Sequence, residues 1–343
     1  MKKIITCSDG TWNKPYQKDD GAVSPTNVYE FSRLISKTDS RNIRQLVFYD
    51  EGVGTEWYDK IRGGIFGMGI NKNIIQAYTF IAENYEPGDE IYLYGFSRGA
   101  YTARSVAGFI YNSGLLRAEN INKKNIRDAF LLYKDRNKNS KPSSDRAKKF
   151  RADNCYDNVT LKCIGVWDTV GSLGIPLEIF YKFNKNIINT QFYDVTLNKN
   201  IKFAFHAVAI DEHRKPFDVA MWERHPDAAE QVMEQRWFPG VHCDVGGGYR
   251  NRDLSDCTLA WMIEKSKLAG LEFNNYNIQG NPSGQMHDSM KIYYEVLGSI
   301  DRKIGIATGY IETISDEARK RWNDNADNYR KEANPNLNNA IKA

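Results

Sequence analysis

The residues with the clearest chemical potential are Gly95 to Gly99, which place Ser97 in a Gly-x-Ser-x-Gly sequence. An apolar stretch, Ile91 to Phe96, precedes the serine, and a stretch that can continue as a helix, Tyr101 to Ile110, follows it. This order of strand, tight turn and helix is typical of a nucleophile elbow. A serine hydroxyl is a weak nucleophile at its free pKa and needs a base nearby. The motif therefore predicts covalent catalysis at Ser97.

His242 is the histidine best placed to act as that base. Trp237 to Val241 predicts a strand that leads into it, and Cys243 to Gly248 predicts a flexible loop after it. His242 would then stand at the carboxyl end of a strand, where the base of such a site belongs. His206 lies inside an apolar run, which favours a structural role. A loop histidine bonded only to backbone is the alternative interpretation of His242.

Two aspartates are candidates for the acid that orients the base. Asp168 follows the apolar run Leu161 to Trp167 and precedes small turn residues, which predicts a half-buried carboxylate able to hold an imidazolium. By strand count, Asp211 follows the strand that more often bears the acid, but it sits among charged residues and is expected to be solvated. We therefore prefer Asp168 and keep Asp211 as the alternative.

The oxyanion of a tetrahedral intermediate also needs hydrogen-bond donors. The amide of Arg98, directly after the nucleophile, is the first by position. The second is expected from Gly10 or Thr11, because these residues follow the first predicted strand and the glycine allows close backbone approach.

Apolar runs rich in β-branched or aromatic residues alternate with stretches of helical spacing. The predicted helices run from Ile70 to Tyr85 and from Ser255 to Leu268. Strands separated by such long crossovers predict an α/β fold with a mostly parallel central sheet flanked by helices, and functional residues at the carboxyl ends of the strands. The predicted strands are Lys3 to Thr6, Gln45 to Asp50, Glu90 to Tyr94, Leu161 to Trp167, Phe203 to Ile210 and Arg236 to Val241.

The chain shows no internal repeat, Gly/Ser linker or convincing domain boundary, so residues 1–343 are expected to form a single domain. The segments 115–151 and 175–195 are longer than a minimal crossover. They predict either core helices or helical cap insertions that give an apolar substrate a place to lie. After Gly270 the chain turns polar, and residues 272–343 are expected to form a peripheral region.

The composition, with 41% hydrophobic and 26% charged residues, is that of an ordinary globular protein. The first residues, Met1 to Asp9, hold two lysines and only a short apolar run. This predicts neither a signal peptide nor a membrane span, and hence synthesis as a cytoplasmic protein. The five cysteines include no Cys-x-x-Cys pair, which argues against a disulfide framework and against a thiolate zinc site.

Lysine and arginine are crowded into residues 123–151, although the formal net charge of the chain is only +4. A solvated helical face would account for this cluster. The sharper alternative is peripheral contact with an anionic membrane. No aromatic interleaving or nucleic-acid fold signature accompanies the cluster, so no nucleic-acid partner is expected.

Five motifs, in register along the chain, resemble the catalytic domain of the type VI secretion phospholipase effectors of the Gly-x-Ser-x-Gly class and their uncharacterised relatives. The resemblance extends from Met1 to about Leu337. The motifs are Cys7 to Asn13, Glu51 to Thr55, Gly95 to Arg104, Gly165 to Gly171 and Trp237 to Tyr249.

The resemblance implies an α/β-hydrolase-like fold, ester hydrolysis of phospholipids, and a triad on Ser97, Asp168 and His242. It also implies a secretion or immunity partner and export by a type VI-like route. The chain departs from the secreted effectors in lacking the large extra region expected for membrane docking, and Cys243 stands where the histidine loop usually has serine. A small soluble ester or an acylated metabolite is the alternative substrate.

Two other function classes fit parts of the sequence. The string Asp9 to Thr11 is similar to the start of phosphatases that use an aspartyl nucleophile and magnesium, but their nucleophile would fall on Cys7. A hydrolase-like fold could also have become a binding module. No cofactor is expected, yet acids at predicted strand ends, among them Asp9, Asp50 and Asp244, leave a divalent cation open.

Overall fold

The computed structural model describes residues 1–10, 13–52, 65–135, 140–170, 196–290, 298–305 and 312–342. Its centre is a seven-stranded sheet in the order β4-β1-β5-β6-β7-β8-β9, in which every neighbouring pair is parallel. A two-stranded hairpin, β2 and β3, lies outside it. The strands are β1 (Lys3–Ser8), β2 (Lys18–Asp19), β3 (Ala22–Val23), β4 (Gln45–Asp50), β5 (Glu90–Phe96), β6 (Leu161–Trp167), β7 (Ile201–Ala209), β8 (Val232–Phe238) and β9 (Glu312–Ile314).

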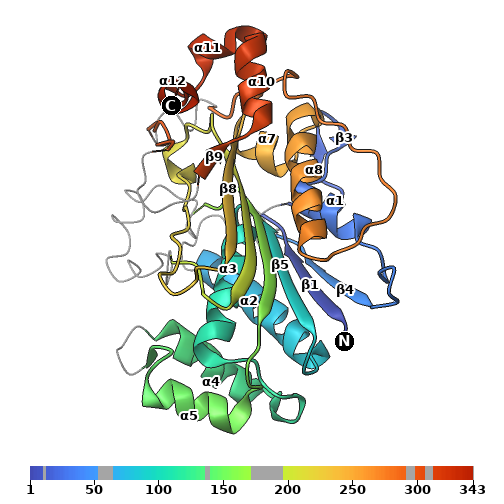
Figure 1. Cartoon of the computed structure of the whole chain (residues 1–343), viewed down its shortest axis with the longest axis vertical. Coiled ribbons are helices and arrows are strands. Elements are labelled where there is room, and N and C mark those ends of the chain that lie inside the picture. Colours follow the sequence, from blue (N-terminus) through green and yellow to red (C-terminus); the bar gives the residue numbers. More distant parts are fainter. Residues whose placement is uncertain are drawn as a thin grey trace.

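Helices cover both faces of the sheet, with α2 and α3 on one side and α1 and α8 on the other (Figure 1). The helices are α1 (Asn27–Leu34), α2 (Ile65–Asn84), α3 (Arg98–Ser113), α4 (Lys123–Lys134), α5 (Asp145–Asn154), α7 (His242–Gly246), α8 (Asp253–Leu268), α10 (Asp316–Asp324), α11 (Tyr329–Glu332) and α12 (Pro335–Lys342). Short 3-10 turns form at Ala118–Asn120, Lys215–Phe217 and Ala326–Asn328.

Alternation along the strands explains why both faces are covered. In β5, Ile91 and Leu93 pack in the cluster that includes α2 and α3, whereas Tyr92, Tyr94 and Phe96 pack in the cluster that includes α1 and α8. Successive side chains of a strand point to opposite faces of a sheet, so a strand that is apolar at every position must be buried on both. This three-layer arrangement confirms the predicted α/β fold with a mostly parallel sheet.

The strand order reverses at β1, which lies between β4 and β5. In open parallel sheets, ligands bind outside the carboxyl ends of the strands at such a switch point. Here the loops that follow β1 and β5 meet, because a Cβ built on Gly10 would lie 3.2 Å from the Cβ of Ser97. The topology therefore places the predicted nucleophile at the edge where this fold class binds ligands.

The segment 115–151, predicted as core helices or a cap, contains α4 and the first part of α5. Both helices pack on the C-terminal half of α3, where Ser113 Oγ donates to the carbonyl of Ala129 and Asn112 to that of Leu132. In Figure 1 they lie at the lower end of the sheet, whereas α7 lies at the upper end. A role of this segment in covering a substrate stays a prediction, and the whole of 175–195 lies outside the described residues.

Residues 272–343, predicted as peripheral, contribute to the sheet and to its core. β9 pairs with β8 at the sheet edge. Tyr329 and Leu337 are fully buried in a cluster with Trp237 of β8 and Val208 of β7. The prediction of a peripheral region misses this packing, because the segment is polar overall and its few apolar residues are widely spaced.

Candidate active site

Ser97 lies in the tight turn between β5 and α3. Its backbone has φ 58° and ψ −121°, with φ in the positive range that residues other than glycine rarely adopt. No side chain would fit at either flanking glycine: a Cβ on Gly95 would overlap the carbonyl of Gly99, and a Cβ on Gly99 would overlap the carbonyl of Ser8. Strand, turn and helix therefore meet as a nucleophile elbow requires.

A hydrogen bond joins the predicted base to the preferred acid. Nδ1 of His242 lies 2.5 Å from Oδ2 of Asp168, and both side chains are almost fully buried. A carboxylate can only accept, so Nδ1 carries the proton and Nε2 keeps its lone pair. The two residues follow β6 and β8, and they are brought together across the end of β7.

Two aromatic rings hold the His242 imidazole from the sides. The ring of Phe96, next to the predicted nucleophile, has its centre 4.5 Å from the imidazole centre, and the ring of Phe217 lies edge-on at 5.0 Å. His242 begins α7, so the flexible loop predicted for Cys243 to Gly248 is wrong for its first part, which is helical up to Gly246. The helical turn fixes the base more firmly than a loop would.

Burial and neighbouring charges have opposite effects on the pKa values of Asp168 and His242. Burial alone would raise the pKa of Asp168, but the positive charge of Arg302 and the contact with His242 outweigh burial and hold that pKa well below its ordinary value. Burial lowers the pKa of His242, and the Asp168 carboxylate opposes this only in part. The pair therefore rests as an ionised carboxylate and a neutral imidazole, the state that a general base requires.

Arg302 was not predicted from the sequence. Its fully buried guanidinium donates to both carboxylate oxygens of Asp168, from Nη1 to Oδ1 at 2.6 Å and from Nη2 to Oδ2 at 3.0 Å. The amide of Ala209 also donates to Oδ1, at 2.9 Å. Nothing in the local sequence around residue 302 indicates this contact, since the partner lies 134 positions away.

Glu212 is a second buried acid beside the base. Its carboxylate accepts from the His242 amide at 3.2 Å and from the Arg214 side chain in a two-bond ion pair at 2.8 Å. Burial alone would raise the pKa of Glu212, but Arg214 outweighs it and lowers that pKa. The charged run from Asp211 to Arg214 was visible in the sequence but gave no indication that Glu212 is buried.

Asp211, the alternative acid, has other partners. Its carboxylate accepts from the Gly240 amide at 2.7 Å, from the Tyr329 hydroxyl at 2.9 Å and from the Asn334 amide at 3.2 Å. The expectation that Asp211 is solvated is wrong, because the residue is only 2% exposed. It ties the C-terminal segment to the end of β8 and makes no recorded hydrogen bond to His242.

Two of the other candidate acids, Asp9 and Asp244, are also engaged elsewhere. Asp9 accepts from the hydroxyls of Thr26 and Tyr49 at 2.6 and 2.7 Å. Asp244 binds Nδ1 of His287 at 2.6 Å. Within the described ranges, no three His, Cys, Asp or Glu side chains gather as metal ligands. A divalent cation and the absence of any cofactor both stay predictions.

The predicted oxyanion donors differ in their surroundings. The amide of Arg98 begins α3 directly after Ser97, which is the position of the first donor in a nucleophile elbow. The amide of Gly10 donates to its neighbour Asp9 at 2.7 Å, so in this conformation the Gly10 amide is engaged within its own loop. Thr11 lies outside the described residues.

Ser97 and His242 share no recorded hydrogen bond, although both belong to the described part of the chain. The contact that links them runs through Phe96, which precedes the serine and packs on the imidazole. A proton transfer from Ser97 to His242 is therefore part of the functional proposal below. Catalytic hydrogen bonds are often long before substrate binds.

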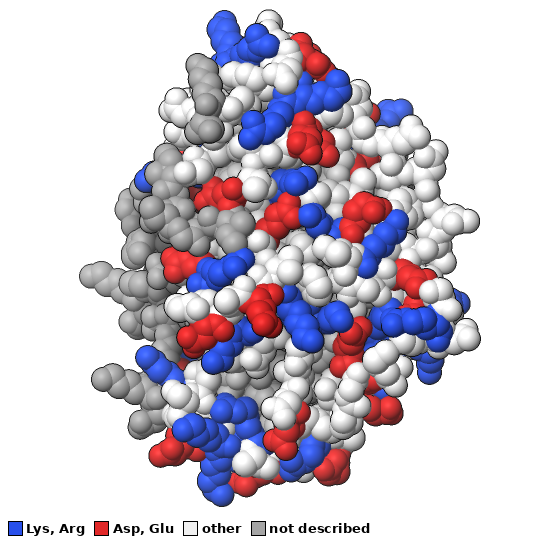
Figure 2. All heavy atoms as spheres, in the orientation of Figure 1, with Lys and Arg blue, Asp and Glu red and all other residues white. Residues whose placement is uncertain are grey.

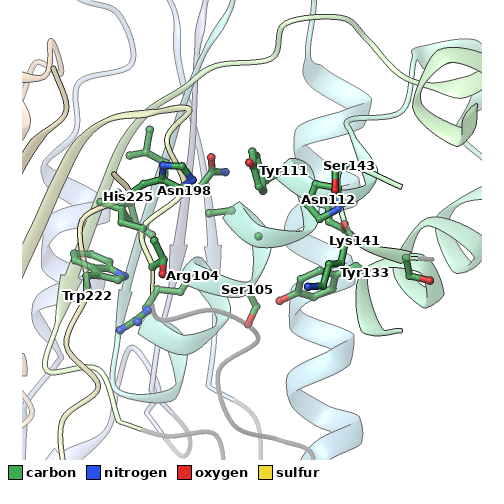
Figure 3. A pocket seen from close by; sticks show the side chains of 18 of the residues that line it. Arg104, Ser105, Tyr111, Asn112, Tyr133, Lys141, Ser143, Asn198, Trp222 and His225 are labelled. Atoms are coloured by element: carbon green, nitrogen blue, oxygen red, sulfur yellow. The ribbon is translucent and has the colours of Figure 1, made fainter. Parts of the chain in front are cut away.

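A cavity of about 510 Å³ lies beside α3, starting about two turns beyond Ser97 (Figure 3). Tyr111 and Tyr133 line one part of it and Trp222 and His225 another. Arg104 stacks on the Trp222 ring at 5.1 Å and donates to the Ala220 carbonyl. Among the described residues, the wall of this cavity includes no member of the predicted triad.

The basic cluster predicted over 123–151 lies on α4 and α5, where blue side chains mix with red ones at the lower end of Figure 2. Lys123, Lys134 and Lys148 are exposed. Part of the charge is paired, as in Lys124 with Asp128 at 3.1 Å. Over the described residues, no helix is long and apolar enough to cross a membrane.

A family model matches most of the chain. The model is described as "T6SS, Phospholipase effector Tle1-like, catalytic domain", and it matches residues 2–265. The chain is also 28% identical over 238 residues to the uncharacterized protein YEL023C of Saccharomyces cerevisiae, a match that spans 63% of this chain and 32% of the yeast protein.

Two solved structures match parts of the chain. A crystal structure of an uncharacterized protein from Pseudomonas aeruginosa matches with a TM-score of 0.50 and 17% identity over 95% of this chain and 50% of that one. The Tle1 effector bound to the VgrG spike of the type 6 secretion system matches with a TM-score of 0.39 and 18% identity over 72% of this chain and 51% of that one. The chain thus spans between a third and a half of its relatives.

Proposed function

Because this chain belongs to the family of Tle1-like catalytic domains of type VI secretion phospholipase effectors, we propose that it hydrolyses carboxylic esters with Ser97 as the nucleophile. In this proposal His242 is the general base and Asp168 orients the imidazole. The observation that carries it is the hydrogen bond of His242 to a buried, ionised Asp168 beside a serine held in a nucleophile elbow.

The proposed acylation step begins when Oγ of Ser97 attacks the ester carbonyl carbon. Nε2 of His242 takes the hydroxyl proton, and the carbonyl electron pair moves to the oxygen, whose negative charge accepts from the Arg98 amide. The intermediate then collapses, the bond from carbon to the alcohol oxygen breaks, and the imidazolium returns the proton to the leaving alcohol. An acyl group remains on Ser97.

Deacylation repeats these transfers with water. His242 takes a proton from the water, the water oxygen attacks the acyl carbon, and the bond to Ser97 Oγ breaks as the serine regains a proton. The products are a carboxylic acid and an alcohol, and no oxidant, reductant or metal is consumed. A neutral imidazole at the start of each half-reaction is what the lowered pKa of His242 favours.

We propose phospholipid as the substrate class. Family membership supports this choice, and the exposed lysines of α4 and α5 suit an anionic lipid surface. A small soluble ester or acylated metabolite is the alternative. Export by a type VI-like route and a secretion or immunity partner follow from the family only as further proposals, since the chain spans part of its relatives' length. Synthesis in the cytoplasm stays a separate proposal.

The decisive experiment replaces Ser97 with alanine. The wild type is expected to react with a fluorophosphonate probe, to hydrolyse p-nitrophenyl butyrate and to release fatty acid from phosphatidylglycerol vesicles, and Ser97→Ala is expected to lose all three. Ser105→Ala is the matched control, because this serine lies on α3, the helix that follows Ser97, and is also buried but is not in the elbow. Its activity should equal that of the wild type.

Two outcomes would contradict the proposal at different levels. Full activity of Ser97→Ala, or probe labelling at another residue, would remove the serine mechanism. Turnover of the short ester with no fatty acid released from vesicles would keep the mechanism and replace phospholipid with a small soluble ester.

A further inference from the structure

Arg302 approaches the triad carboxylate as a two-pronged fork. Its two terminal nitrogens bind the two oxygens of Asp168 at 2.6 and 3.0 Å, and both side chains are fully buried. On the premise of the triad proposed above, we propose that Arg302 is a positioning residue for the reaction. It fixes the orientation of the Asp168 carboxylate, and the carboxylate in turn orients the His242 imidazole.

The hydrogen bonds of the carboxylate show what Arg302 adds. Oδ1 accepts from the Ala209 amide, and Oδ2 accepts from His242. These two contacts alone leave each oxygen with one partner, whereas the arginine fork binds both oxygens at once. Bidentate pairing of a guanidinium with a carboxylate fixes orientation as well as charge.

Arg302 is itself held firmly enough to act as a support. Its guanidinium also donates to the carbonyls of Ala209 and Phe217 at 2.7 and 2.5 Å. Its own carbonyl accepts from the side chains of Asn334 and Asn336 at 2.9 and 3.0 Å. The arginine is therefore anchored at the backbone and at the head group, independently of Asp168.

The guanidinium of Arg302 lies close to the base, because it binds the same carboxylate that holds the imidazole. Two acids contact His242, Asp168 at the imidazole and Glu212 at the backbone amide. Each acid is paired with one cation, Asp168 with Arg302 and Glu212 with Arg214. Removal of the Arg302 charge leaves two acids and one cation, which favours the imidazolium form. The pKa of His242 should then rise, and the acid limb of the pH dependence of kcat/KM should move to higher pH.

The test measures kcat and KM for p-nitrophenyl butyrate in Arg302→Lys and Arg302→Gln. The lysine keeps the charge without the fork, so kcat should fall about 10- to 100-fold, bounded by the roughly 10⁴-fold expected when the acid itself is lost. KM should stay unchanged, because the buried arginine has no access to substrate. The kcat of Arg302→Gln should be lower than that of Arg302→Lys, and the acid limb of its kcat/KM profile should lie at higher pH than in the wild type.

Asp168→Asn provides the second half of a double-mutant cycle. If Arg302 acts through Asp168, Arg302→Lys should change kcat less than twofold in the Asp168→Asn background. An equal loss in both backgrounds would overturn the inference. A folded Arg302→Lys enzyme whose kcat is within twofold of the wild-type value would also overturn the inference. If Arg302→Gln does not fold, the kcat of Arg302→Lys and the double-mutant cycle with Asp168→Asn are sufficient to test the inference.

Arg321→Lys is the matched control. Arg321 is another fully buried arginine of the C-terminal segment, and it binds the carbonyls of Pro282 and Gly284 at 3.0 and 2.6 Å. Its replacement should lower stability while leaving kcat of the folded enzyme unchanged. Ser97→Ala, run in parallel, separates the two proposals: activity there would defeat the serine mechanism, whereas its loss together with a wild-type Arg302→Lys would defeat only the role of Arg302.

Discussion

Ser97 and Asp168 share an uncommon backbone conformation, with φ of 58° and 37°. Such a conformation costs a residue with a side chain on the order of 1–3 kcal/mol and persists only where neighbours enforce it. Here the Ser97 amide donates to the Trp167 carbonyl at 3.1 Å, and the Asp168 amide donates to the Ala207 carbonyl at 2.8 Å. Two strained residues, each directly after one of the adjacent strands β5 and β6, support the proposal of a shared catalytic role.

The choice between the two aspartates gives a prediction at this scale. Asp168→Asn should lower kcat by about 10⁴-fold, because an amide at this position favours the wrong imidazole tautomer. Asp211→Asn should lower the unfolding free energy, since it disturbs the contacts with Gly240 and Tyr329, yet leave kcat of the folded protein near wild type. Steady-state kinetics with p-nitrophenyl butyrate checks both, and a crippled Asp211→Asn enzyme would reverse the assignment.

The sequence was enough to propose Ser97, Asp168 and His242 as a triad, because each follows an apolar strand and has a type suited to its proposed role. The structural role predicted for His206 agrees with its surroundings: it is fully buried, its Nε2 accepts from the Thr169 amide at 3.1 Å, and burial lowers its pKa to about 3. Arg302 could not be found in this way. Its role depends on a contact across 134 positions, which no local pattern encodes.

At the scale of elements, the site depends on how closely α3 approaches the end of β1. Gly99, in the first turn of α3, lies against the Ser8 carbonyl with no room for a side chain. Gly10, just beyond β1, lies against Ser97 itself. The elbow is therefore shaped by α3 and by the end of β1, which lie about 90 residues apart in the chain, while β1 pairs in the sheet with β5, the strand that leads into the elbow.

Gly99→Ala tests this close approach. The added methyl group would force β1 and α3 apart, so the unfolding free energy should fall by at least about 1–3 kcal/mol and esterase activity should fall with it. Gly108→Ala is a control in the same helix, because its Cβ would meet only the Tyr133 ring, at 3.3 Å. Urea denaturation compares the two. Equal stability of Gly99→Ala and Gly108→Ala would show that the contact is not restrictive.

The elements themselves were largely predictable. All six predicted strands are present, with ends that differ by a few residues, because apolar runs flanked by glycine or acids mark buried parallel strands. β9 was missed, since only three residues form it and pairing with β8 creates it. The short helix that begins at His242 was missed because the glycines 246–248 are typical of a loop.

At the scale of the whole molecule, the C-terminal part holds the histidine segment in place. Nδ1 of His287 binds Asp244 of α7 at 2.6 Å, and the His287 ring stacks on Tyr249 with centres 3.9 Å apart. The hydrogen bond with Asp244 is the main reason why the pKa of His287 is raised, and Asp19 and Asp20 add to it.

This contact predicts a pH-dependent stability. A raised pKa in the folded state means that protonated His287 stabilises the fold fully below its unfolded pKa of about 6.5, and that this contribution is lost as pH rises through the folded pKa. The wild type should therefore exceed His287→Gln in unfolding free energy by more at pH 6 than at pH 9. Urea unfolding at both pH values measures the margin, and an equal margin would refute the prediction.

The distance along the chain between Asp168 and its arginine has a consequence for biosynthesis. During translation, Ser97, Asp168 and His242 all leave the ribosome before residue 302 has been joined to the chain. Until then Asp168 lacks its guanidinium counter-ion, and the other hydrogen bonds described for its carboxylate are those with His242 and the Ala209 amide. A nascent chain that does not yet include residue 302 is therefore expected to hydrolyse esters more slowly than a chain that includes it.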